Sequence, residues 1–134
     1  MSVSSVNATQ NARLMPISAQ HQICLRELSL PCHIGVPSEE RAELQTLKAN
    51  VCVTPALAFE QMEDQIERTI DYAAVAQRLR ELASSRPRAL LETLAWEMAN
   101  TLLDEFGAIQ ARVELHKWIL PECGPSVVSI ELRA

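Results

Sequence analysis

The sequence predicts an α+β domain in which a four-stranded antiparallel sheet carries two helices on one face. Three observations support this prediction. Segments with the two-residue period of strands occur near both ends of the chain, segments with the helical period lie between them, and turn-forming residues separate the segments. The order of two strands, two helices and two strands puts a hairpin-like pair on each side of a helical pair, which is typical of α+β folds.

A single domain accounts for most of the chain. Its 134 residues and 48% hydrophobic content are typical of one globular domain. Residues 1–20 are rich in Ser, Asn, Gln and Ala without a sustained apolar period, so we expect a flexible tail followed by a domain over residues 21–134. No apolar run approaches the roughly 20 residues of a transmembrane helix, and no signal peptide is evident, so we expect a cytoplasmic protein.

The first strand is predicted over residues 22–32, where Pro31 indicates an edge or a strand end because proline cannot donate to a ladder. The second covers about residues 47–54, and its alternation is that of a half-buried antiparallel strand. Its apolar face comprises Leu47, Ala49, Val51 and Val53. Residues 33–46 form a loop with Gly35, Pro37 and a charged tip.

After a polar surface connection at 60–69, Asp71 is a candidate helix cap. Apolar residues then recur at helical spacing, namely Tyr72, Val75, Ala76, Leu79 and Leu82. Residues 84–88, which include Pro87, interrupt the pattern. A second helix is predicted over about 89–106 with a stripe of Leu91, Leu94, Ala95, Met98 and Leu102, and Gly107 is its C-terminal cap.

The third strand is predicted over residues 109–117, and its alternation makes Lys117 the last residue of the apolar face. A loop at 118–125 precedes the last strand at 127–132, where Val128, Ile130 and Leu132 point inward. Such a sheet has two open edges, which invite pairing with another chain. We therefore expect ring-like association of subunits, strand to strand.

Composition excludes several partners and sites. Twelve basic and 17 acidic residues give a net charge of -5, which argues against nucleic acid or an anionic membrane as partner. The cysteines form no C-x-x-C pair, and three lie among apolar strand residues, so we expect reduced, buried thiols. They are Cys24, Cys32, Cys52 and Cys123. The three histidines show no ligand spacing, so we predict no metal site.

Four side chains are candidates for chemistry, and each also has a structural interpretation. Lys117 either extends its amine to solvent at a strand end or exchanges protons with a lowered pKa. Glu92 either favours a helix N-terminus or accepts two parallel N–H donors from a planar ligand. Tyr72, the single tyrosine, is either a core aromatic or a proton-donating phenol. Glu40 is either a solvated loop charge or a ligand-orienting carboxylate.

Taken together, these residues stand in short motifs that resemble dihydroneopterin aldolases from about residue 22 to residue 133. The motifs are CHIGV at 32–36, EER at 39–41 with Gln45, TIDYAAV at 69–75, LLETLA at 90–95 and VELHK at 113–117. The resemblance implies the tunnelling fold (T-fold), in which subunits form a barrel-like ring. It also implies a tetrameric ring, with two rings stacking into an octamer, and a pterin bound between neighbouring subunits.

The resemblance further implies a metal-independent aldolase without a Schiff base or cofactor, which cleaves 7,8-dihydroneopterin into 6-hydroxymethyl-7,8-dihydropterin and glycolaldehyde in folate biosynthesis. Glu92 is expected to anchor the pterin, with the backbone near Leu91 facing the ring. Lys117 is the expected general acid/base, and Tyr72 of the adjacent subunit the expected proton donor. Glu39 or Glu40 fits the loop carboxylate that orients the substrate, and the distance from Gly35 favours Glu40.

Two other functions stay open. A dihydroneopterin triphosphate 2'-epimerase shares the fold and the proton-transfer residues, and a pterin-binding module without catalysis would keep only the pocket. The chain departs from the aldolase pattern at Trp118, where the family usually has proline, and at Val128, where glycine is common. The loop at 122–125 is also atypical. These differences lie near the expected rim of the pocket and bear on substrate choice.

Overall fold

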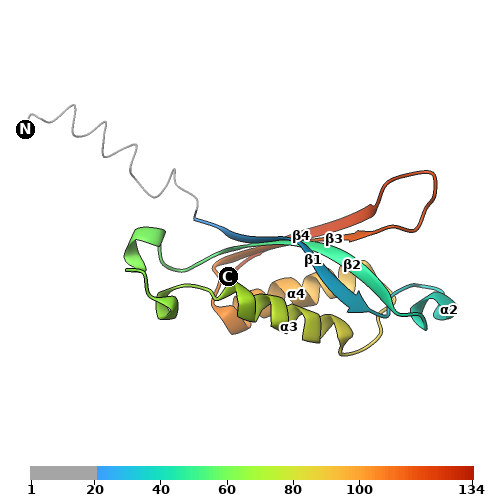
Figure 1. Cartoon of the computed structure of the whole chain (residues 1–134), viewed down its shortest axis with the longest axis horizontal. Helices are drawn as coiled ribbons and strands as arrows, with labels where there is room; N and C mark the ends of the chain where they lie inside the picture. The colour runs from blue at the N-terminus through green and yellow to red at the C-terminus, as the bar shows by residue number, and fades with distance from the viewer. Residues whose placement is uncertain (1–20) are drawn as a thin grey trace, which may run out of the picture.

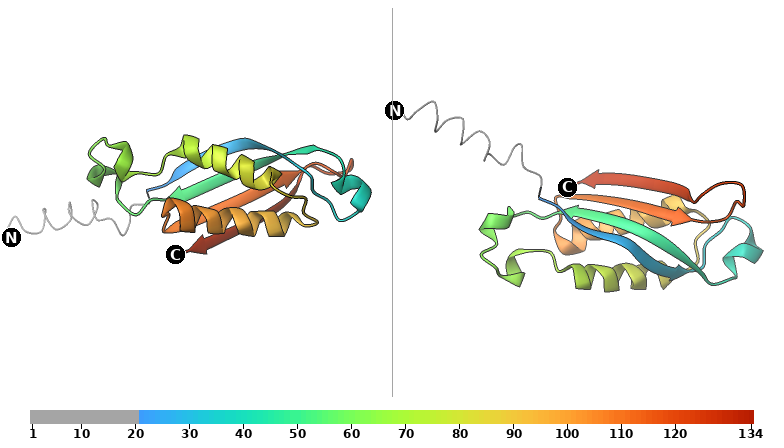
Figure 2. Two further views of the ribbon diagram at one scale, coloured as in Figure 1. Left: turned by 90° about the horizontal axis from the view of Figure 1, so that it is seen from below. Right: turned by 45° about the horizontal axis from the view of Figure 1, so that its top comes forward.

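The chain was analysed as a computed structural model that describes residues 21–134. Four strands form one antiparallel sheet in the order β1-β2-β3-β4. They are β1 (Ile23–Cys32), β2 (Gln45–Thr54), β3 (Gln110–Lys117) and β4 (Ser126–Arg133). Helices α3 (Tyr72–Ser84) and α4 (Leu91–Phe106) both cover one face of this sheet (Figures 1 and 2). The predicted fold class and element order are confirmed, while the tail predicted for 1–20 lies outside the described residues.

The core lies between the sheet and the two helices. The predicted apolar face of β2 is buried throughout, and alternate residues of β3 join it. The last strand is less covered, because its inward residues Val128, Ile130 and Leu132 are only half-buried against the core. The sheet therefore has two open edges, as predicted, and the structure identifies them as β1 and β4.

Helix α3 begins where its capping residue predicted. The side chain of Asp71 accepts hydrogen bonds from the backbone N–H groups of Ala73 at 3.0 Å and Ala74 at 3.4 Å. The predicted apolar stripe is wrong at its first residue, because Tyr72 is 61% exposed and the buried side of α3 begins one turn later at Val75. Tyr72 is thus a solvent-facing phenol at the helix start.

Helix α4 starts two residues later than predicted and stops as predicted. Leu90 precedes it in an extended conformation without a side-chain cap. At the other end Gly107 has φ 68°, a left-handed conformation that glycine adopts without a steric penalty. The stripe facing the sheet includes Leu94, Met98 and Leu102, as expected.

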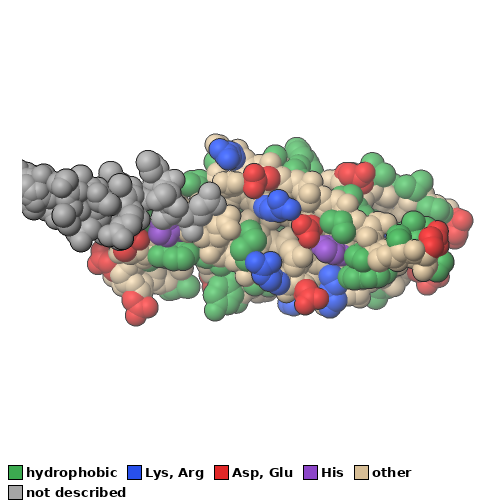
Figure 3. All heavy atoms as spheres, turned by 90° about the horizontal axis from the view of Figure 1, so that it is seen from above, with side chains coloured by type: hydrophobic (Ala, Val, Ile, Leu, Met, Phe, Trp, Pro, Cys, Tyr) green, Lys and Arg blue, Asp and Glu red, His purple; other side chains and the backbone are tan. Residues whose placement is uncertain are grey.

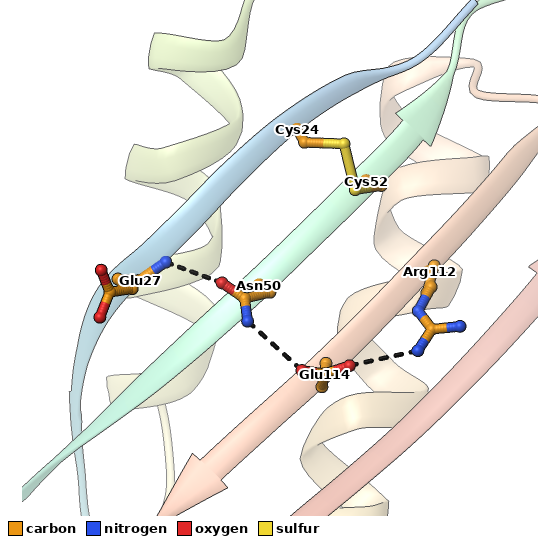
Figure 4. Close-up of a disulfide and its surroundings, with 6 residues drawn as sticks. All are labelled: Cys24, Glu27, Asn50, Cys52, Arg112 and Glu114. Atoms are coloured by element: carbon orange, nitrogen blue, oxygen red, sulfur yellow. Dashed lines mark hydrogen bonds and ion pairs between the residues drawn. A yellow bond between two sulfur atoms is a disulfide. The ribbon is translucent and has the colours of Figure 1, made fainter. Parts of the chain in front are cut away.

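The alternation of buried and exposed residues along β1 is interrupted in the middle of the strand. Its pairing with β2 shifts between Leu25 and Leu28, so that Glu27 adopts φ 54° in a β-bulge. The backbone N–H of Glu27 donates to Asn50 Oδ1 at 2.9 Å (Figure 4). Beyond the bulge, Leu28 and Leu30 return to the core.

The prediction of reduced, buried cysteines is wrong for Cys24 and Cys52, and for Cys123 it is wrong in burial alone. Cys24 and Cys52 are directly opposite in the β1–β2 pairing and form a disulfide (Figure 4). Antiparallel pairing brings such facing side chains together although 28 positions separate them in the sequence. Cys32 is a buried free thiol, as expected, whereas Cys123 is a free thiol on the surface.

The sheet face turned away from the helices carries interspersed charges of both signs (Figure 3). On it, Glu114 binds His116 Nε2 at 2.7 Å, Arg112 at 3.2 Å and Asn50 at 3.3 Å. These partners hold the pKa of the Glu114 carboxyl below its usual range, with His116 the largest contributor. No helix within residues 21–134 is long and apolar enough to cross a membrane.

Candidate functional site

A cavity of about 350 Å³ opens at the end of the sheet where β3 finishes and α4 begins. Three chain segments line it, at residues 34–40, 89–92 and 117–119. The helix α2 (Ser38–Arg41), at the right of Figure 1, marks this end of the molecule. Four of the predicted site residues line this one cavity: Glu40, Leu91, Glu92 and Lys117.

Lys117 is buried, with only 7% of its surface exposed, because it continues the face of β3 that carries Leu115. Its amine donates to the carbonyl of Ile34 at 3.1 Å and to Glu40 Oε1 at 3.2 Å. A buried amine is tolerated only when such acceptors compensate its lost hydration. The structure therefore places the amine at the wall of the cavity, between a backbone carbonyl and a carboxylate.

Glu40 reaches Lys117 because its carboxylate passes close to Gly35, which has no side chain to block it. A Cβ atom added at Gly35 would overlap the Glu40 carboxylate, and the φ of 153° there is one that other residues rarely adopt. Glu39 instead accepts a hydrogen bond from Ser38 at 3.4 Å. Of the two neighbouring carboxylates, Glu40 is the one that contacts the lysine.

Two side chains that the sequence analysis did not single out fix the conformation of this loop. Arg41 donates to the carbonyls of Gly35 at 2.8 Å and Val36 at 3.0 Å. Gln45 donates to the carbonyls of Ile34 at 2.6 Å and Glu40 at 3.1 Å. Both stand within the quoted family motifs. Their partners are backbone carbonyls, which every residue has, so the sequence does not indicate which residues they contact.

Glu92 lies in the first turn of α4, exposed and lining the same cavity as the lysine. The unpaired N–H groups of a helix start favour a negative charge there. Leu90 and Leu91 flank it and provide apolar surface beside its carboxylate. A flat ligand with adjacent N–H donors would satisfy both the carboxylate and this apolar surface.

Tyr72 is the predicted site residue that the structure does not bring to the cavity. It begins α3, and the 13 residues of that helix run from Tyr72 toward the cavity end of the molecule. At 1.5 Å per residue this helix is about 20 Å long. Within one subunit the phenol therefore cannot reach the cavity.

The ionisable groups facing the cavity are two carboxylates and one amine. Cys32 is buried and is not part of the cavity lining. Burial raises the pKa of its thiol despite the opposing charges of Lys117 and Arg88. The thiol is therefore protonated near neutral pH. Within residues 21–134, no group of three or more His, Cys, Asp or Glu side chains is arranged to hold a metal ion.

The chain is similar to known proteins over most of its length. The FolB family model, dihydroneopterin aldolase, matches residues 23–133. The dihydroneopterin aldolase of Streptomyces coelicolor is 30% identical over 100 residues, which are 72% of this chain and 81% of that protein. The region matched by the family model includes all five residues proposed from the sequence, namely Glu40, Tyr72, Leu91, Glu92 and Lys117.

Solved structures show the same fold. The Escherichia coli dihydroneopterin aldolase in complex with neopterin superimposes with a TM-score of 0.77 at 24% identity, covering 84% of this chain and 98% of that one. A Burkholderia dihydroneopterin aldolase bound to guanine gives a TM-score of 0.72 at 24% identity, covering 90% and 98%. The chain has the tunnelling fold that these structures share.

Proposed function

Because the chain belongs to the dihydroneopterin aldolase family, we propose that it cleaves 7,8-dihydroneopterin by a retro-aldol reaction without a metal ion or a Schiff base. The products are 6-hydroxymethyl-7,8-dihydropterin and glycolaldehyde. The observation that carries this proposal is that the amine of Lys117 and the carboxylate of Glu92 line one cavity of about 350 Å³. A bicyclic heterocycle fits a site of this size.

Glu92 is proposed to bind the pterin by accepting hydrogen bonds from its 2-amino group and N3–H. Two parallel charge-assisted bonds are strong and fix the plane of the ring. The exposed position of Glu92 in the first turn of α4, beside Leu91, supports this role. With the ring held there, its substituted edge extends along the cavity toward Lys117.

Lys117 is proposed to move protons, acting through water on pterin N5 and on the side-chain hydroxyl. The 2'-hydroxyl loses its proton, the C1'–C2' bond breaks, and its electron pair moves into the ring as N5 gains a proton. Glycolaldehyde leaves, and the enol-like intermediate then takes a proton at C1' while N5 gives one up. Glu40, 3.2 Å from the amine, orients the water and the substrate side chain.

Tyr72 is proposed to protonate the intermediate from an adjacent subunit. Its exposed phenol lies at the opposite end of α3 from the cavity of its own chain. The two open sheet edges, β1 and β4, support a closed ring in which one copy's Tyr72 end meets the next copy's cavity. A tetrameric ring, with two rings stacked into an octamer, is the proposed assembly.

The charges of the cavity favour this substrate over its triphosphate. A triphosphate would add several negative charges to a lining that already carries Glu40 and Glu92 against the single amine of Lys117. Like charges that share a partly buried site repel one another. The epimerase alternative would need cations from outside this lining.

Product analysis tests the proposal. The chain is incubated separately with dihydroneopterin and with its triphosphate, and glycolaldehyde, the hydroxymethyl pterin and the 2'-epimer are quantified. We expect glycolaldehyde and the hydroxymethyl pterin from the first substrate. Epimer formation from the triphosphate alone would replace the proposal by the epimerase, and pterin binding without any product would replace it by a non-catalytic module.

A further inference from the structure

Arg88 is a buried arginine in a segment whose composition predicts a surface connection. It lies between α3 and α4 in the sequence Ser-Ser-Arg-Pro-Arg, yet only 4% of its surface is exposed. Buried arginines are rare unless their donors are satisfied, because the guanidinium loses its hydration. Sequence reasoning treated this segment only as a helix break.

The guanidinium is satisfied by both helices. It donates to Glu97 Oε2 at 2.9 Å and to Oε1 at 3.3 Å, which is a two-pronged contact with α4. It also donates to the carbonyl of Leu82 at 3.1 Å and of Ala83 at 3.3 Å, in the last turn of α3. One side chain thus connects the end of α3 to the second turn of α4.

The backbone of Arg88 is fixed equally well, and on the side of the cavity. It forms an isolated parallel bridge with Ile34, in which Arg88 N–H donates to the carbonyl of His33 and Gly35 N–H donates to the carbonyl of Arg88, both at 3.1 Å. Ile34 is the residue whose carbonyl accepts from the amine of Lys117. Glu97, Arg88, Ile34 and Lys117 therefore form a continuous series of contacts.

This series joins the two walls of the cavity. The segment at 34–40 carries Glu40, and the segment at 89–92 starts one residue after Arg88 and carries Glu92. We propose that Arg88, held by Glu97, is a positioning residue that sets the separation of these walls and so the distance between Glu92 and the amine of Lys117. The expected loss of turnover rests on the proposed function, whereas the fixed separation of the two walls rests on the contacts alone.

The test compares Arg88→Gln, Arg88→Lys and Glu97→Gln with Arg86→Gln as the matched control. Arg86 also binds Glu97, at 2.7 Å, but its side chain is half exposed and its guanidinium has no contact with the cavity walls. Binding of neopterin is measured by fluorescence, turnover of dihydroneopterin by product release, and amide hydrogen exchange at residues 33–36 and 88–92 by mass spectrometry, all well below the melting temperature.

We expect Arg88→Gln to lower kcat/KM by roughly 10- to 100-fold, the scale of an ångström-sized misplacement of reacting groups. Neopterin binding should weaken and exchange at both segments should accelerate. Arg88→Lys should rescue little, because one ammonium cannot replace the forked contacts. Arg86→Gln should resemble wild type in all three measurements.

A lowered melting temperature with unchanged kcat/KM, binding and exchange in the folded protein would overturn the inference, since Arg88 would then be structural only. Where Arg88→Gln does not fold, Glu97→Gln is judged by the same criteria. If the wild-type chain itself does not turn over dihydroneopterin, the proposed function fails, and the exchange data still decide whether Arg88 positions the two walls.

Discussion

Lys117 is a buried lysine whose cost to stability is offset by its hydrogen bonds. Its amine occupies the end of an apolar strand face, where an unpaired lysine would be destabilising. The carbonyl of Ile34 and the carboxylate of Glu40 compensate for this burial while leaving the amine at the cavity wall. This fixed position of the amine supports the proton-transfer role proposed for Lys117.

The first prediction concerns this amine. Lys117→Ala should lower kcat for dihydroneopterin by about 10²-fold or more, because a positioned proton-transfer group is lost. Neopterin affinity should change little, since the ring is anchored at Glu92. Lys48→Ala is the control, because that amine binds Ser29 Oγ at 2.7 Å outside the cavity. Equal turnover in both variants would refute the acid/base role.

The second prediction concerns Gly35. Gly35→Ala should reduce turnover and destabilise the fold by about 1 to 3 kcal/mol, because the new Cβ displaces Glu40 and the backbone at φ 153° is strained. Steady-state kinetics and urea denaturation measure the two effects. Gly124→Ala is the matched control, since nothing lies within 4 Å of its added Cβ. Wild-type kinetics in Gly35→Ala would show that the Glu40 contact is dispensable.

At the level of elements, the connection between α3 and α4 does more than join them. Its buried Arg88 forms an ion pair with Glu97 of α4 and hydrogen bonds with the last turn of α3, and so connects the two helices. The hydrogen bonds from Arg88 lower the pKa of the Glu97 carboxyl, and the nearby charges of Arg88 and Arg86 lower it further. Folding therefore favours the ionised form of Glu97.

The third prediction is the pH dependence of this pair. A carboxyl whose pKa is lowered by folding contributes stability above its ordinary pKa, and the contribution disappears as pH falls through the lowered value. Glu97→Gln should thus be less stable than wild type by about 2 to 3 kcal/mol at pH 7, leaving a buried guanidinium underpaired. Below roughly pH 4 the difference should shrink.

Urea unfolding of both proteins between pH 3 and pH 8 measures this difference. Glu105→Gln is the control, since Glu105 pairs with Arg78 at 2.8 Å on the surface, where such pairs contribute little. A difference for Glu97→Gln that stays constant across the pH range would contradict the assignment of its stability to the ionised carboxyl.

At the level of the whole molecule, the residues of the proposed active site lie at two opposite ends of the folded subunit. The cavity lies at one end of the sheet, and Tyr72 begins a helix about 20 Å long that starts at the other. Large exposed apolar side chains occur in both parts: Val36 and Leu90 line the cavity, and Ile66 precedes Tyr72 by six residues in the sequence. The proposed contact between one copy's Tyr72 end and the next copy's cavity would cover these side chains.

The fourth prediction follows from this division. Tyr72→Phe and Lys117→Ala should each have little activity, but refolding them together should restore turnover. In randomly mixed rings about one quarter of the sites combine an intact lysine from one copy with an intact tyrosine from the next. Activity is measured on the oligomer fraction from size-exclusion chromatography.

Glu92→Ala mixed with Lys117→Ala is the control for this experiment. Both residues line the cavity of the same chain, so no combination of these copies yields a complete site. Recovery in the control mixture, or its absence in the tyrosine mixture of intact rings, would contradict the shared site.

The sequence by itself determined the strands of the core, both helices, the capping roles of Asp71 and Gly107 and the apolar-face position of Lys117. Each of these features depends on residues that are close together in the sequence. Local periodicity and backbone preferences therefore predict them directly. The family motifs also brought together Glu40, Glu92 and Lys117, which line one cavity in the structure.

Only the tertiary structure decided the Cys24–Cys52 disulfide, the exposure of Tyr72 and the burial of Arg88. It also showed that Glu40, which the spacing from Gly35 had favoured, is the carboxylate that contacts Lys117. Each depends on a partner distant in sequence or on the way a loop folds back on itself. Arg88 is the clearest case, because its surroundings of Ser and Pro predict a surface position. Its burial arises only when two helix ends and Ile34 converge around one guanidinium, which periodicity along the chain does not record.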